Sequence, residues 1–164
     1  MPTIADAEAI VRRCAFVLAC SARLEIPVTI SEQYPKGLGP TIASLVEAAN
    51  AAPRLAKTWF SAMNDPALSE RIGELRGAGR GQLVLIGIEA HVCVLQTAFA
   101  AHRAGYEVFV VADAVGSRSR QDREAGLSRM AMAGISIVTA EMAMFEWLEQ
   151  SGTADFKALS ALIR

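Results

Sequence analysis

Residues 82–98, QLVLIGIEAHVCVLQTA, carry the clearest structural pattern in this chain. Its first part, residues 83–87, is a short apolar run after a glycine-rich lead-in at 77–81, which predicts a buried strand. From Ala90 onward the apolar residues recur at helical spacing, which predicts a helix over residues 90–103. A short turn at 87–90 joins the two, so Cys93 falls in the first turn of the helix.

Cys93 therefore lies where a helix begins after a strand. The unpaired backbone N–H groups of a first turn and the positive end of the helix dipole favour the thiolate form of a cysteine. A strand, a tight turn and a nucleophile at a helix start together present a reactive side chain at the top of an α/β sheet. A cysteine that only fills space as a small apolar residue fits the same pattern, so the pattern alone leaves both interpretations open.

The composition of the chain limits the classes of protein to which it can belong. With 164 residues, 52% of them hydrophobic and 20% charged, we expect one domain over 1–164, a well-buried interior and a homo-oligomer interface. The net charge of −1 and the absence of a Lys/Arg cluster give no indication of nucleic acid or an anionic membrane as partner. Neither a signal peptide nor a membrane-spanning run is expected, and a reducing, cytoplasmic setting is predicted.

Predicted strands alternate with predicted helices along the chain. The strands are expected at 26–30, 54–60, 83–87, 107–112 and 136–139, and the helices at 3–24, 42–49, 64–75, 90–103, 119–132, 141–149 and 153–163. The strands lack a regular polar alternation, which is typical of a parallel sheet covered by helices on both faces. Active residues of such a sheet lie at the carboxyl ends of the strands, where Lys57, Cys93 and Asp113 are expected.

Four segments resemble the isochorismatase-like cysteine hydrolases, and most closely their isochorismatase domain-containing branch. These segments are SEQYPKGLG (31–39), KTWFSAM (57–63), GIEAHVC (87–93) and ADAVGSRS (112–119), in the family's order and at its spacing. The similarity runs from residue 2 to the end of the chain. It implies a Rossmann-like α/β fold, hydrolysis of a small amide, ester or related carbonyl-type substrate, and no cofactor or metal.

The resemblance also implies roles for particular residues. Cys93 matches the nucleophile and Lys57 matches the lysine of the family's Asp-Lys-Cys triad, and the backbone N–H groups of Glu89 and Cys93 match its oxyanion hole. The peptide Ile88–Glu89 is expected to be cis. Without the resemblance, a solvated lysine at a strand end is the favoured interpretation of Lys57. His91 is expected outside the triad, and Asp113 is expected to anchor a loop or cap a helix.

The pocket around Cys93 is predicted from the strand-end segments that carry polar and aromatic side chains. The candidates are Glu32, Gln33, Tyr34, Trp59 and Phe60. Their amide and aromatic character favours a small, planar, partly polar ligand. The cysteines Cys14 and Cys20 are expected to fill the core, because their spacing fits neither a metal site nor one helix face.

One departure from the family concerns the start of the chain. The family's first strand ends in Asp-x-Gln and supplies the triad's Asp, whereas here residues 1–4 already match the segment that opens the first helix. The strand is therefore expected upstream of Met1, and the chain carries two triad members of three. In the family's strand order 3-2-1-4-5-6, that strand lies between those predicted at 26–30 and 83–87. Five parallel strands with an interruption at this place are therefore expected.

Three functions remain open on the sequence. The first is a cysteine hydrolase that forms a covalent intermediate at Cys93. The second is a non-catalytic binding or scaffold protein that has the same fold without the triad Asp. The third is a thiol-based redox role for Cys93, which the lack of a second cysteine nearby in sequence disfavours.

Overall fold

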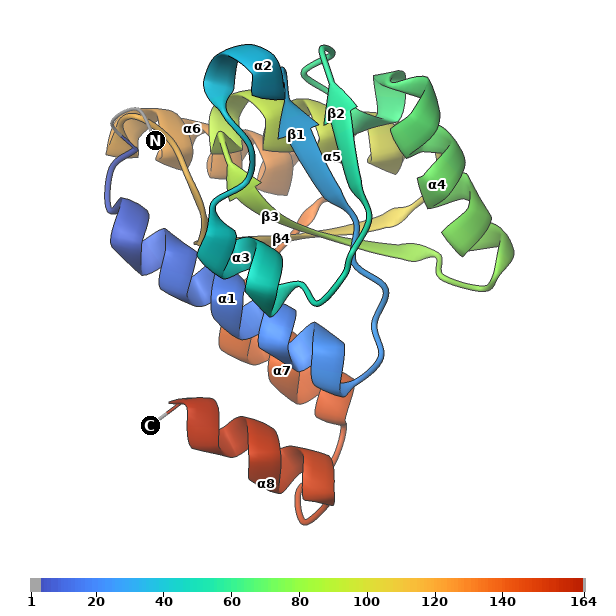
Figure 1. Ribbon diagram of the computed structural model, residues 1–164, viewed down its shortest axis with the longest axis vertical. Helices are drawn as coiled ribbons and strands as arrows, with labels where there is room; N and C mark the ends of the chain where they lie inside the picture. Colours follow the sequence, from blue (N-terminus) through green and yellow to red (C-terminus); the bar gives the residue numbers. More distant parts are fainter. Residues whose placement is uncertain (1–3, 164) are drawn as a thin grey trace.

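The structure is a computed structural model that describes residues 4–163, and in it parallel strands pack between helices (Figure 1). The strands are β1 (Ile30–Gln33), β2 (Arg54–Lys57), β3 (Gln82–Ile88), β4 (Glu107–Gly116) and β5 (Ser136–Val138). The α-helices are α1 (Ala7–Arg23), α2 (Pro35–Leu38), α3 (Ala43–Ala48), α4 (Pro66–Gly77), α5 (Leu95–Arg103), α6 (Arg120–Met132), α7 (Ala140–Leu148) and α8 (Ala154–Ser160). Shorter turns are η1 (Ala62–Asn64), η2 (Ala90–Val94) and η3 (Ala161–Ile163). The predicted α/β architecture is confirmed.

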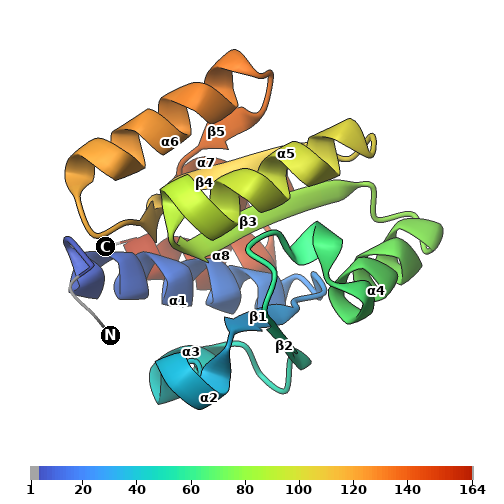
Figure 2. The same cartoon turned by 90° about the horizontal axis from the view of Figure 1, so that it is seen from above.

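Helices cover both faces of the sheet that contains β3. Figure 2 shows α5 and α6 above β3 and β4, with α1 below them. Along β3, Leu83 and Leu85 pack into the core on the α5 side, whereas Val84 and Ile86 pack into the core that contains α1 and α7. Because successive side chains of a strand point to opposite faces, a strand with a core on each side must be apolar throughout. This explains the unbroken apolar run of residues 83–86.

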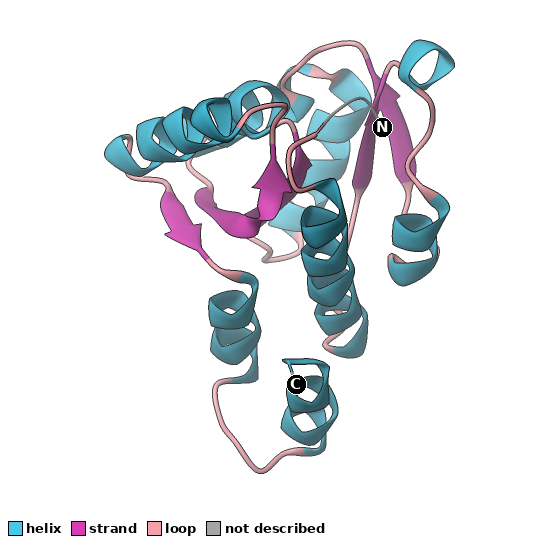
Figure 3. Ribbon diagram, turned by 90° about the vertical axis from the view of Figure 1, so that its left-hand side faces the viewer, coloured by secondary structure: helices cyan, strands magenta, loops and turns pink. Residues whose placement is uncertain are grey.

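The strands form two separate parallel sheets. One contains β1 and β2, and the other contains β3, β4 and β5 in that order. Within residues 4–163, β1 pairs with no strand but β2, and β3 pairs with none but β4. The two sheets stand apart in Figure 3. The five parallel strands, divided into a sheet of β1 and β2 and a sheet that begins at β3, agree with the prediction of five parallel strands with an interruption.

The first strand lies four residues later than predicted. Residues 26–29 are not a strand, and β1 instead includes the polar residues Ser31, Glu32 and Gln33. Its position follows from pairing with β2, since Ile30 N–H donates to Pro53 O at one end and Tyr34 N–H donates to Lys57 O at the other. Three of the four β1 residues are half-buried and Ser31 is exposed, so the strand tolerates polar side chains that a central strand excludes.

Two other elements differ from their predicted form. The helix after β3 begins as the π-helical turn η2 and becomes α-helical only at Leu95, so Cys93 lies in a π turn. Strand β4 continues past residue 112 to Gly116, because it bulges between Val110, which pairs with Leu85, and Val115, which pairs with Gly87. The bulge places Asp113 inside the strand, and the extension beyond it reaches the segment beside η2.

Candidate active site

Lys57 and Cys93 meet at the carboxyl edge of the two sheets. Lys57 is the last residue of β2 and is only 4% exposed, and its Nζ lies 3.7 Å from Cys93 Sγ. The loop that follows β2 folds around the ammonium group, which donates to the carbonyl oxygens of Trp59 at 2.9 Å and Phe60 at 3.0 Å. An ammonium group held this close to a sulfur, and shielded from water, stabilises negative charge on that sulfur.

Gln33 links Lys57 to the rest of the site. The parallel register places Gln33 directly beside Lys57, and Gln33 Oε1 accepts a hydrogen bond from Lys57 Nζ at 2.5 Å. The amide is oriented by Gln33 Nε2, which donates to Thr58 O at 2.8 Å, and Cys93 Sγ lies 4.0 Å from Oε1. Gln33 was predicted only as a pocket residue, and its contact with Lys57 depends on strand pairing that the sequence alone does not specify.

The other predicted pocket residues lie around this pair in different ways. Tyr34, Trp59 and Phe60 are each about half exposed, at 53%, 55% and 53%. Trp59 and Phe60 reach Lys57 through their backbone carbonyls, which leaves their rings on the surface beside it. Glu32 faces away from Lys57, because its carboxylate accepts a hydrogen bond from the N–H of Thr41, which lowers the pKa of this carboxyl. Ile42 occupies the N-cap position of α3, and Thr41 just before it binds Glu32.

The turn that carries Cys93 has an unusual backbone. The peptide Ile88–Glu89 is cis, as predicted. After it, the carbonyl oxygen of Glu89 accepts hydrogen bonds from the N–H groups of both Val92 and Val94, which closes the π turn η2 around Cys93. The side chains of Glu89 and His91, on the same turn, contact residues of the segment between β4 and α6. Those contacts were not predicted.

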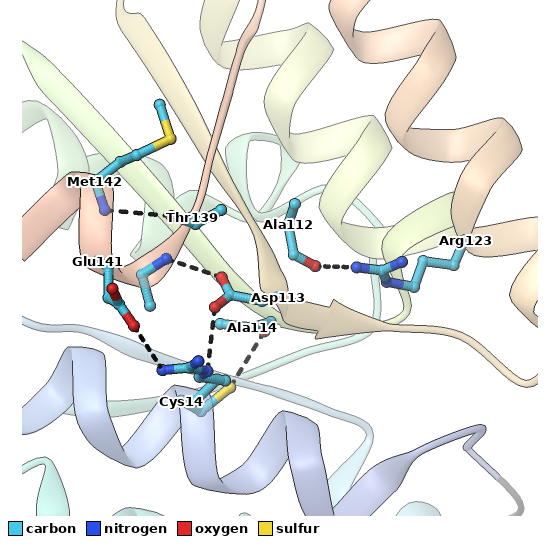
Figure 4. Close-up of polar contacts among 10 residues, drawn as sticks. Cys14, Ala112, Asp113, Ala114, Arg123, Thr139, Glu141 and Met142 are labelled. Carbon is cyan, nitrogen blue, oxygen red and sulfur yellow. Dashed lines mark hydrogen bonds and ion pairs between the residues drawn. The ribbon is translucent and has the colours of Figure 1, made fainter. Parts of the chain in front are cut away.

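Asp113 caps a helix, as predicted, and does not contact Lys57 or Cys93. Its carboxylate accepts a hydrogen bond from Ala140 N–H at the start of α7 and forms an ion pair with Arg13 at 3.2 Å (Figure 4). The bulge of β4 that positions Asp113 is held by Arg123, which donates to the carbonyl oxygens of Ala112 and Val115.

Cys14 and Cys20 are buried in α1, as predicted. Cys14 Sγ donates to Ala114 O at 3.2 Å, and burial raises the pKa of both thiols to about 11 (Figure 4). Neither cysteine contacts Cys93.

Residues 4–163 have two further properties. No group of three or more His, Cys, Asp and Glu side chains in this part of the chain is placed to hold a metal ion. Over the same residues, no helix is both long and apolar enough to span a membrane.

Parallel strands between helix layers define a Rossmann-like α/β protein, and a cysteine in the turn after β3 lies beside a buried lysine at the candidate site. A family model described as the isochorismatase domain matches residues 1–142, and the chain therefore belongs to this family of isochorismatase-like hydrolases. The recognition made from the four sequence segments is confirmed.

Curated relatives and solved structures agree with this assignment. The chain is 40% identical over 141 residues to isochorismatase domain-containing protein 1 of Danio rerio, covering 86% of this chain and 48% of that protein. It is 37% identical over 163 residues to isochorismatase domain-containing protein 2 of the same organism, covering 99% of this chain and 80% of that protein. This chain thus spans about half the length of the first relative and four fifths of the second.

Among solved structures, the MAR1 ribonuclease from Caenorhabditis elegans is similar with a TM-score of 0.89 and 36% identity, over 98% of this chain and 81% of that one. The YcaC protein of Escherichia coli, described as an octameric hydrolase of unknown specificity, has a TM-score of 0.85 over 96% of this chain and 78% of that one. Its identity of 22% makes the likeness one of fold alone.

Proposed function

We propose that this protein is a cysteine hydrolase that acts on a small amide, ester or related carbonyl-type substrate through a covalent intermediate at Cys93. The observation that carries the proposal is the 3.7 Å contact between Lys57 Nζ and Cys93 Sγ, with the lysine 4% exposed. Burying an ammonium group is costly unless it is paired and hydrogen-bonded, so its position beside a thiol favours a thiolate as its partner.

The reaction begins with the thiolate. Sγ attacks the carbonyl carbon, the S–C bond forms, and the π electrons of the carbonyl move onto its oxygen. The backbone N–H groups of Glu89 and Cys93 are assigned to stabilise this oxyanion. Collapse of the intermediate breaks the bond to the leaving group, which takes up a proton and departs. Water then attacks the thioester, the C–S bond breaks, and the thiolate returns with release of the acid and one proton.

Proton transfer in the second step requires a base, which the resemblance assigns to a carboxylate beside Lys57. Within residues 4–163, the ammonium group of Lys57 is bound by the neutral oxygens of Gln33, Trp59 and Phe60 and by Cys93, and takes part in none of the ion pairs. The base therefore separates the proposal from its main alternative. A binding or scaffold protein on this fold needs no base and does not turn over.

The substrate is proposed to be small and partly planar, because Tyr34, which follows Gln33, and Trp59 and Phe60, in the loop after Lys57, are each about half exposed. The same exposed aromatic side chains support a homo-oligomer as the working assembly, and the E. coli protein of this fold is described as octameric. No cofactor is assigned to the reaction.

An activated ester tests the proposal directly. Native protein is mixed with p-nitrophenyl acetate, nitrophenolate release is followed, and the site of acetylation is mapped by mass spectrometry. We expect one acetyl group on Cys93, its loss in Cys93→Ala, and an unchanged burst in Cys20→Ala. Acetylation of Cys14 or Cys20 in preference to Cys93 overturns the proposal, as does a Cys93→Ala variant that reacts like the wild type.

Turnover then distinguishes the hydrolase from the scaffold. We would assay a panel of small amides and esters for more than one equivalent of product per protein molecule. An RNA oligonucleotide is included in the panel because the C. elegans relative is described as a ribonuclease. Hydrolysis of a carbonyl substrate that depends on Cys93 supports the hydrolase. A stable acetyl-enzyme without turnover of any panel member favours the scaffold.

A further inference from the structure

The turn that carries Cys93 is fastened by a segment that the proposed mechanism does not use. His91, two residues before Cys93, lies with its Nδ1 at 2.9 Å from the hydroxyl of Ser117, which follows β4. Ser117 is 1% exposed, so this hydrogen bond is shielded from water. Burial raises the cost of losing such a bond, because the remaining partner then lacks both protein and water contacts.

The next residue of the same segment holds the other end of the turn. Arg118 donates to the carboxylate of Glu89 from its Nε at 3.0 Å and from its backbone N–H at 3.4 Å. Glu89 follows β3 directly, and its side chain is only a quarter exposed at 25%. A charge-assisted hydrogen bond is shorter and stronger than a neutral one, so the Arg118–Glu89 bond restrains the segment after β4 relative to the turn after β3.

Helix α6 packs directly against the turn that carries Cys93. A Cβ atom at Gly126 would lie 3.1 Å from His91 Cα and 3.3 Å from Ala90 O, so glycine at this position lets the helix backbone touch the turn. Three independent contacts therefore join the segment 117–126 to residues 89–91. None of the three involves Lys57 or Gln33, which instead contact the sulfur of Cys93.

We propose that Ser117 and Arg118 are positioning residues for the oxyanion hole. They fix Glu89 and His91, and thereby aim the backbone N–H groups of Glu89 and Cys93 at the developing oxyanion. This inference rests on the proposed hydrolase mechanism. Lys57 and Gln33 act on the sulfur, whereas Ser117 and Arg118 act on the backbone around it, so the two groups control different parts of the reaction.

Two reactions of Cys93 separate these parts. Alkylation by iodoacetamide takes place at a saturated carbon, builds no oxyanion, and depends on the thiolate and its access. Acetylation by p-nitrophenyl acetate builds a tetrahedral oxyanion and therefore depends on the two N–H groups as well. A residue that only positions the oxyanion hole alters the second rate and spares the first.

The test compares Ser117→Ala and Arg118→Ala with the matched control Ser119→Ala. In the native protein, the Ser119 hydroxyl accepts a hydrogen bond from Asp122 N–H at the start of α6 and does not contact the turn. We expect acetylation to fall about 10- to 100-fold in the first two variants. Alkylation should stay within about twofold of the wild type in all three, as should acetylation of Ser119→Ala. Glu89→Gln, which keeps an acceptor oxygen for Arg118, should retain more acetylation than Glu89→Ala.

Equal acetylation rates in the wild type, Ser117→Ala and Arg118→Ala overturn the inference, as does a parallel fall of both reactions. If Ser117→Ala does not fold, Arg118→Ala decides, because the Arg118 side chain is 62% exposed and its loss leaves the core intact. A wild-type protein whose Cys93 is not acetylated at all refutes the hydrolase proposal itself, which is a different result.

Discussion

The two sheets of this molecule differ in what they bury. In the sheet of β3, β4 and β5, Val110 and Val111 are fully buried between two helix layers. In the sheet of β1 and β2, Lys57 is the single buried residue. The larger sheet is thus organised around an apolar core, whereas the smaller one buries a charged side chain at the site. The strands β1 and β2 are therefore positioned more by the contacts of the site and its loops than by core packing.

Few polar contacts hold the two sheets in place relative to each other. Besides the Lys57–Cys93 contact, the N–H of Ala62, in the turn after β2, donates to Thr97 Oγ1 in α5 at 2.9 Å. Both Ala62 and Thr97 are buried, at 8% and 5% exposure. Changes at this boundary should therefore affect the site more than equal changes within either sheet.

The largest effect is expected from a strand placed between the sheets. The segment before α1 lies near the carboxyl ends of the strands, because Ala5 N–H donates to the carbonyl oxygen of Ser117 just after β4. A strand added before this segment can therefore reach the two sheets. A designed extension ahead of Met1, with a Val/Ile-rich strand that ends in Asp, should pair with the edges of β1 and β3 that have no partner strand within residues 4–163. Each buried backbone group that gains a partner is worth about 1–3 kcal/mol. We expect an increase in unfolding free energy on the order of 5 kcal/mol, or about 10–20 °C in Tm.

A matched extension keeps the length and apolar content but has Pro at alternate strand positions, which removes the N–H donors of those residues. It should raise Tm far less than the Val/Ile strand in a calorimetric scan. If both extensions leave Tm at the value of the 164-residue chain, these edges of β1 and β3 are not available to a strand.

The second effect concerns the ammonium group at the boundary. Lys57→Met keeps the length of the side chain and removes the charge that faces Cys93 Sγ at 3.7 Å. We expect iodoacetamide to alkylate Cys93 about 10- to 100-fold more slowly at neutral pH, because less thiolate is stabilised. Rates are measured by intact mass on the folded protein, with the exposed Lys36→Met in α2 as control. Equal rates for wild type and Lys57→Met would remove Lys57 from the site.

Most of the helices and strands were predictable from the sequence, because the signals that define them lie within or next to each element. Residues 83–87 are apolar on both faces, and Asp65 and Ser119 are capping residues that do accept from Leu68 and Asp122 N–H groups. Such signals lie within a few residues of the element they define. The shift of β1 from 26–30 to Ile30–Gln33 was not predictable, because it depends on pairing with β2, more than twenty residues away in sequence.

The site shows the same division. Cys93 and Lys57 were predicted from short motifs, whereas the residues that contact them or their turn come from distant segments. Gln33 depends on strand register, and the contacts of Ser117 and Arg118 depend on a β4 bulge that no local pattern announces. Contacts of this kind have no short-range signature in one sequence.

Substitutions of two threonines test whether the Ala62–Thr97 hydrogen bond, which links the turn after β2 to α5, stabilises the fold. Thr97→Val keeps the shape of the side chain and leaves the buried Ala62 N–H without its acceptor, which should cost about 1–3 kcal/mol of unfolding free energy in urea titrations. Thr29→Val is the matched control, because the buried Thr29 hydroxyl has no hydrogen-bond partner within residues 4–163. That substitution should be neutral or stabilising. Equal losses in both variants would mean that the Ala62–Thr97 bond contributes nothing specific.

The smallest effect tests the larger sheet, through the two thiols of α1. Burial raises the pKa of Cys14 and of Cys20 from about 9 to about 11, so the folded protein holds these protons where the unfolded chain releases them. Stability from a raised pKa is fully present below about pH 9 and is lost as the pH rises toward about 11. At pH 10, each thiol should have lost about 1 kcal/mol of that stability. The unfolding free energy of the wild type should therefore fall more between pH 8 and about pH 10 than that of Cys20→Ala, which releases one proton fewer on unfolding. Urea titrations at both pH values measure the two slopes, and comparing slopes cancels the cavity that the substitution creates. Identical slopes would show that burial in α1 does not raise the pKa of Cys20 in the folded protein.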